Sequence, residues 1–164
     1  MNQPDDTEIE LRQLLRPSLD GRWDDDELAE LDPETAGPFM AKVMRDESES
    51  LGTRTMAMQL LVYLGDARAA EPLADLLDAR DPVLRARAAT ALGRLGHVDQ
   101  QSLDRLVRAL EDAEPFVRES TAEALGALRH AAAVPALRRV RDEDDFPDTR
   151  DAARNALRAM GEDT

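Results

Sequence analysis

The chain has 164 residues, which suits one compact domain or one short array of repeats. It carries 35 acidic and 21 basic residues, a formal net charge of −14, and no cysteine, so disulfides and thiolate metal sites are excluded. A charge this negative argues against nucleic acid as a partner, because binding to phosphates needs basic side chains.

The first ten residues, MNQPDDTEIE, are acidic and lack the basic and apolar regions of a signal peptide. No apolar run in the chain approaches the ~18 residues that a membrane-spanning helix needs. We therefore expect a cytoplasmic protein that does not bind membranes.

Residues 1–35 differ in pattern from the rest of the chain. The stretch DDTEIELRQLLR predicts one helix that ends before Pro17, PSLDGRWDDD predicts a turn-rich linker, and a second short helix follows through Leu28 and Leu31. We interpret this segment as an acidic N-terminal helical cap or arm, and residues 36–164 as a separate domain.

Trp23 is the only tryptophan and lies among acids in GRWDDDEL. Tryptophan is enriched among the residues that dominate binding interfaces, so Trp23 is a candidate anchor for a partner. The alternative is that its side chain folds back and covers the end of the first repeat.

From about residue 36 the chain repeats itself. The stretches DPVLRARAATALGRLG, EPFVRESTAEALGALR and FPDTRDAARNALRAMG share one pattern, and LGTRTMAMQLLVYLG is a weaker copy. Their equivalent arginines, Arg54, Arg85, Arg118 and Arg150, follow one another at intervals of 31, 33 and 32 residues. A period of this length indicates a repeat array.

The apolar residues of each copy predict one face of a helix. In the second copy they are Leu84, Ala88, Ala91, Leu92 and Leu95, a spacing of i, i+4, i+7, i+8 and i+11. Shorter amphipathic stretches lie between the copies and predict a second helix in each repeat. Neither helix of a pair can bury its apolar side alone, so we expect stacked pairs with one continuous core. The predicted first helices lie near residues 51–64, 82–95, 115–128 and 147–160.

The segment GDARAAEPLADLLDARDPVLRARAATALGRLG resembles the short HEAT repeat of phycobilin lyase-type proteins, and the resemblance extends over about residues 36–161. It implies an all-α fold: a right-handed α-solenoid of about four short HEAT repeats, here with an N-terminal helical cap. It also implies that the second helices line the concave surface.

The same resemblance implies a structural role for Arg54, Arg85, Arg118 and Arg150. In HEAT solenoids an arginine at this position pairs with an acid in a turn between repeats, and these pairs form a ladder. Suitable partners are Asp81, Asp112 or Glu114, and Asp144 or Asp145. A ladder of arginines that bind a ligand is the alternative.

Residues for catalysis or metal binding are scarce. The HEAT-repeat deoxyhypusine hydroxylases bind a di-iron centre through His-Glu pairs, whereas here His97 precedes Val98 and His130 precedes Ala131. There is also no glycine-rich phosphate loop of either common spacing. We predict no catalytic residue, no metal and no cofactor.

Charge is unevenly distributed along the chain. Residues 1–50 hold fifteen acids and five bases, whereas residues 101–141 hold six acids and seven bases. Two readings stay open for the arginines of the predicted second helices: pairs with nearby acids, or a site for an acidic partner surface. The acidic N-terminal arm is one such partner, in the same chain or in a second copy, so we expect a monomer or weak self-association. These arginines are Arg105, Arg108, Arg138, Arg139 and Arg141.

The basic residues include only one lysine, Lys42, and twenty arginines. An acidic, lysine-poor composition resembles that of proteins from salt-loving archaea, because salt screens the self-repulsion of a highly charged chain. The alternative origin is a genome rich in G and C, which also favours Arg over Lys.

We therefore predict a non-catalytic protein–protein interaction module, a small scaffold or adaptor that presents a concave helical surface to a partner with an acidic surface. The alternative is a bilin-lyase-like or enzyme-accessory HEAT protein that acts on a chromophore or assists another enzyme.

Overall fold

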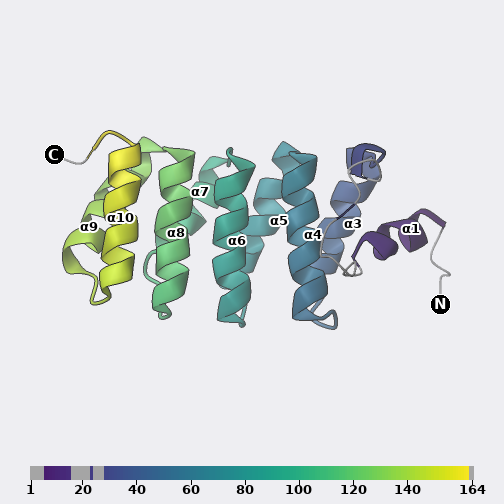
Figure 1. The fold of residues 1–164 in the computed structure, drawn as a ribbon, viewed down its shortest axis with the longest axis horizontal. Helices are drawn as coiled ribbons and strands as arrows, with labels where there is room; N and C mark the ends of the chain where they lie inside the picture. The colour runs from purple at the N-terminus through teal and green to yellow at the C-terminus, as the bar shows by residue number, and fades with distance from the viewer. Residues whose placement is uncertain (1–5, 16–22, 24–27, 163–164) are drawn as a thin grey trace. The chain divides into compact units, whose positions relative to one another are not determined.

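A computed structural model describes residues 6–15, 23 and 28–162 (Figure 1). Within these residues the chain is all-α, with nine α-helices, three short 3-10 helices and no strand. It divides into two compact units, Met1–Asp66 and Ala67–Thr164. None of the helices that the structure describes combines the length and the apolar content that a membrane crossing demands.

The first unit contains helices α1 (Asp6–Leu14), α3 (Pro33–Arg45) and α4 (Leu51–Leu64). Helix α3 packs on α4 and contacts α1. The predicted linker at residues 17–26 lies outside the described residues except for Trp23, and the division between a cap and the repeats at residue 35 stays a prediction. The core of this unit consists mainly of long, flexible side chains with little or no exposed surface, which are Met40, Met44, Met58, Leu60 and Leu61.

In the unit Ala67–Thr164, the second helix of one repeat is followed along the chain by the first helix of the next repeat. Its second helices are α5 (Ala70–Asp75), α7 (Gln100–Ala109) and α9 (Val134–Glu143). Its first helices are α6 (Pro82–Leu95), α8 (Pro115–Leu128) and α10 (Pro147–Ala159). Short 3-10 helices extend α5 at both ends (Ala67–Ala69 and Leu76–Asp78) and precede α9 (Ala131–Ala133).

Local sequence sets the ends of the first helices. At α6, Asp81 precedes the helix and its carboxylate accepts a hydrogen bond of 2.8 Å from the Val83 amide, while Pro82 occupies the first turn. Gly96 ends the same helix in the left-handed conformation, with φ of 77°. Helices α8 and α10 differ, because the N-cap residues Glu114 and Phe146 supply no side-chain hydrogen bond.

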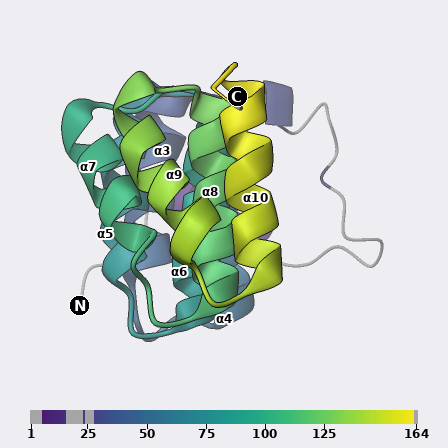
Figure 2. The same cartoon turned by 90° about the vertical axis from the view of Figure 1, so that its left-hand side faces the viewer.

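The helices of the second unit form two layers (Figure 2). Helix α6 packs on α8 and α8 packs on α10, while α5, α7 and α9 form the other layer. The first helices approach closely where the sequence has glycine: a Cβ on Gly93 would lie 2.7 Å from the Ala124 Cα. The leucines between the layers are almost fully buried, among them Leu73, Leu92, Leu103, Leu106 and Leu125. The predicted fold class, an all-α solenoid of helix pairs, is confirmed.

Candidate functional site

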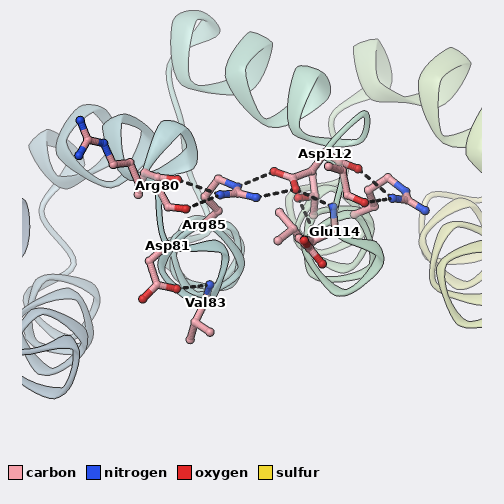
Figure 3. Close-up of polar contacts among 11 residues, drawn as sticks. Arg80, Asp81, Val83, Arg85, Asp112 and Glu114 are labelled. Carbon is pink, nitrogen blue, oxygen red and sulfur yellow. Dashed lines mark hydrogen bonds and ion pairs between the residues drawn. The ribbon is translucent and has the colours of Figure 1, made fainter.

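Arg85 joins two successive repeats through its guanidinium group (Figure 3). Its Nε and Nη2 atoms donate to the two carboxylate oxygens of Asp112, at 2.6 and 2.9 Å. Its Nη1 atom donates to the main-chain carbonyl oxygens of Ala79 and Arg80, at 2.9 and 3.2 Å. One side chain therefore holds the turn before α6 and the turn before α8 together.

Arg118 makes the same set of contacts one repeat later. Its Nε and Nη2 atoms donate to the Asp144 carboxylate at 2.7 and 2.9 Å, and its Nη1 atom donates to the carbonyl oxygens of Asp112 and Ala113 at 2.8 and 3.3 Å. The carboxylate of Asp112 therefore accepts hydrogen bonds from Arg85, and its main-chain carbonyl oxygen accepts one from Arg118. The two sets of contacts are thus linked through this one residue.

The other two arginines of the series bind carbonyl groups. Arg150 donates through Nη1 to the Asp144 carbonyl oxygen at 2.6 Å, and Arg54 donates through Nε to the Met44 carbonyl oxygen at 2.8 Å. Among the described residues, neither forms a close ion pair with a carboxylate, although the sequence places acids near both.

The ion pairs Arg85–Asp112 and Arg118–Asp144 are mostly buried, so water screens the attraction between their charges only weakly. The side chain of Asp144 is 7% exposed and that of its partner Arg118 is 12% exposed. The hydrogen bond from Arg118 holds the pKa of Asp144 below its ordinary value, against the opposing effect of burial. Burial also opposes ionisation of Asp112, but hydrogen bonds from Arg85 and the Glu114 amide lower its pKa overall.

The arginines of the second helices lie on or near the surface, and most are paired. Arg105 contacts Asp75 at 2.6 Å, Arg138 contacts Glu162 at 2.8 Å, and Arg141 contacts Asp142 at 2.7 Å. The sequence did not point to Asp75 or Glu162, since each lies in a different helix or segment from the arginine it binds.

Two further arginines complete this set. Arg139 contacts Glu111, with side chains that are 51% and 66% exposed. The side chain of Arg108 is exposed and makes no hydrogen bond or ion pair with any residue that the structure describes.

Trp23 lies against the first helix of the chain. Its indole Nε1 atom donates to the Leu14 carbonyl oxygen at 2.8 Å, and its side chain is half-buried. This contact satisfies a carbonyl group at the C-terminal end of α1.

A cavity of about 490 Å³ opens between the α7–α8 turn and the α9–α10 turn. We call it the turn groove, and it lies beside the arginine ladder because Arg118, Asp112 and Asp144 line it. Its other lining residues are Leu110, Glu111, Arg139, Val140, Glu143 and Asp145.

His97 and His130 are both exposed. In the described part of the chain, no group of three or more His, Cys, Asp or Glu side chains is placed to hold a metal ion.

The fold and these contacts define an α-solenoid built from helix pairs. The sequence profile of HEAT repeats matches residues 70–158, which is more than half of the chain. The chain belongs to the HEAT-repeat family. No curated protein sequence matches it significantly.

Several solved structures are similar to this chain. Human deoxyhypusine hydroxylase is 29% identical with a TM-score of 0.70; the match covers 80% of this chain and 45% of the hydroxylase, so this chain spans less than half of that protein. The CpcE–CpcF complex of phycocyanin lyase from Nostoc is 21% identical with a TM-score of 0.68, covering 98% of this chain and 67% of that chain. A designed armadillo repeat protein in complex with the peptide (KR)4 is 18% identical with a TM-score of 0.58, covering 93% of this chain and 81% of that chain.

Proposed function

We propose that this chain is a non-catalytic protein-binding module, a small scaffold or adaptor. Its contact surface is the exposed side of helices α5, α7 and α9, which we call the second-helix face. The observation that carries the proposal is Arg108, an exposed cation without a partner among the described residues, in a surface that holds several further arginines.

The ion pairs of the second-helix face are easy to open. The side chains of Arg138 and Glu162 are 47% and 43% exposed, and pairs this exposed stabilise a protein by only about 0–1 kcal/mol. A partner's carboxylate can therefore replace the internal one at little cost. The planar guanidinium group binds a carboxylate with two hydrogen bonds, so an acidic partner surface suits these arginines.

The architecture is compatible with this role. The designed armadillo protein, which is similar in fold, binds the peptide (KR)4. We propose a monomer or weak self-association through the acidic N-terminal segment, in the cytoplasm of a salt-adapted cell. The lyase-like or enzyme-accessory role stays the alternative, since a likeness of 21% identity to the lyase complex supports the fold alone.

The test compares two double variants with equal charge changes. Arg108→Glu with Arg138→Glu alters the second-helix face, and Arg87→Glu with Arg94→Glu alters exposed positions of α6. We expect the first variant to lose the proteins that co-purify with the wild type at matched salt, because like charges then meet across the interface. The second variant should retain them. Equal losses from both variants would mean that only overall charge matters, and the proposed surface would be wrong.

A further inference from the structure

We propose that the turn groove is a second binding site, which takes an Arg or Lys side chain from a basic peptide segment of a partner. This inference goes beyond the proposed function, because it concerns a different surface and a ligand of opposite charge.

The groove is large enough for a long side chain. Its volume is about 490 Å³, and its lining includes Leu110 and Val140, which are 2% and 6% exposed, beside charged residues. A lining of apolar and charged groups together suits the side chain of arginine or lysine, whose aliphatic stem packs on apolar surface while its charged end remains polar.

The charges at the rim are predominantly negative. Five carboxylates line the groove, against the guanidinium groups of Arg118 and Arg139. Arg85 and Arg118 bind two of these carboxylates and Arg139 binds a third. The side chains of the remaining two, Glu143 and Asp145, are exposed and accept no hydrogen bond or close ion pair from any residue that the structure describes, although Asp145 interacts electrostatically with the nearby Arg118. They are available to a cation from outside the chain.

An exposed aromatic ring lies next to the groove. Phe146 directly follows Asp145 and is 48% exposed. Its ring centroid lies 5.5 Å from the guanidinium carbon of Arg118, a residue that lines the groove. Phe146 occupies an N-cap, where a polar residue would stabilise the helix by about 1 kcal/mol. The ring contacts Arg118 within the chain, and its exposed part can also stack with a partner's guanidinium group.

The net charge of −14 supports the same ligand class. A strongly acidic protein attracts basic segments over long distances and raises their rate of association, and this effect weakens as salt is added. Once a basic segment is near, the carboxylates of the groove can bind its side chains directly, which requires those side chains to reach the groove itself.

The experiment uses the full chain and a fluorescein-labelled (KR)4 peptide, with binding measured by fluorescence anisotropy at two salt concentrations. Glu143→Gln with Asp145→Asn removes the two unpaired carboxylates. Glu119→Gln with Glu123→Gln, on α8 outside the groove, changes the net charge equally. We expect the dissociation constant of the groove variant to be about tenfold larger, because charged hydrogen bonds to the peptide are lost. The dissociation constant of the control variant should change by less than about twofold.

A third variant tests the ring. Phe146→Ser should weaken peptide binding several-fold and leave the melting temperature about unchanged, since the serine cap on α10 offsets the lost contact of the ring with Arg118. Loss of binding through misfolding would instead lower the melting temperature, so the two causes are separable. Arg108→Glu with Arg138→Glu should leave (KR)4 binding unchanged or stronger, which distinguishes failure of this site from failure of the second-helix face. The proposal is overturned if the wild type does not bind the peptide, or if the groove and control variants weaken binding equally.

Discussion

Asp144 has almost no access to solvent and yet is held in its charged form by the structure around it. Two hydrogen bonds from Arg118 and one from the Phe146 amide offset the loss of hydration. Such a pair is costly to break from one side, because the remaining charge is then buried without a counter-ion. The value of the pair lies in fixing how successive repeats meet as much as in stability.

This arrangement predicts how stability depends on pH. The folded-state pKa of Asp144 lies below the ordinary value of about 3.9 that the unfolded chain shows, so the unfolded state binds more protons in that range. The stabilisation by Asp144 is therefore complete above about pH 5 and is lost as pH falls through the folded-state pKa. Asp144→Asn should be less stable than the wild type at pH 7, and this difference should shrink below pH 4.

Urea unfolding followed by circular dichroism between pH 7 and pH 3 measures the difference. Asp104→Asn is the control, because Asp104 is exposed and bonds only to the Gln100 side-chain amide within the described contacts, at 2.8 Å. Its effect should be small at every pH. A stability difference for Asp144→Asn that does not change with pH would contradict the assignment of the charge to this carboxyl group.

Individual partners were only partly predictable from the sequence. The resemblance to HEAT repeats implied acidic partners in the turns for Arg85 and Arg118, and Asp112 and Asp144 are among the candidates that it named. The contacts of Arg105 with Asp75 and of Arg138 with Glu162 were not anticipated. These two contacts depend on which sides of neighbouring segments face each other. The spacing of residues within one segment does not predict how it faces another.

At the scale of the helix, the spacing of apolar residues was the most reliable signal. The first helices follow a period that only an α-helix satisfies. Proline marks the start of α6 and α8, and glycine marks the end of α6, whereas Arg129 takes the left-handed conformation at the end of α8. The 3-10 turns that flank α5 could not be predicted, since the same apolar pattern is compatible with both helix types over so few residues. The turn groove was also missed, because its lining comes from two turns 32 residues apart.

Close packing of α8 on α10 depends on the absence of a side chain at Gly126. A Cβ there would lie 2.7 Å from the Cα of Ala156 and 2.8 Å from its Cβ. Gly126→Ala should therefore lower the free energy of unfolding by about 1–3 kcal/mol through overpacking, which exceeds the gain of about 1 kcal/mol in helix propensity.

Gly52→Ala is the matched control for this substitution. A Cβ at Gly52, in α4, would meet no atom nearer than the Ser50 hydroxyl at 3.7 Å. It should leave stability unchanged or raise it by up to about 1 kcal/mol. The midpoints of urea denaturation compare the two variants. A stable Gly126→Ala protein would show that the two helices can separate at no cost.

At the scale of the whole chain, the two units carry different amounts of charge. The unit Met1–Asp66 holds sixteen acids and six bases, a net charge of −10, and the unit Ala67–Thr164 holds nineteen acids and fifteen bases, a net charge of −4. Repulsion among like charges destabilises a compact state. The first unit should therefore be the more sensitive to removal of salt.

We expect the melting temperature to rise steadily between dilute buffer and molar KCl, because the Debye length falls to about 3 Å at 1 M salt and the repulsion is then screened. Differential scanning calorimetry in a series of KCl concentrations measures this. A melting temperature that stays flat or falls over that range would argue against a salt-adapted protein.

The ladder also bears on how a protein of this kind changes length during evolution. Arg85 and Arg118 each bind the turn of their own repeat and the aspartate of the next, so every rung is complete within two neighbouring repeats. Arg150 keeps the contact with the turn of its own repeat, since it donates to the Asp144 carbonyl group. Duplication of one repeat in the gene would extend the series without requiring a compensating change elsewhere, and deletion of one would rejoin equivalent ends.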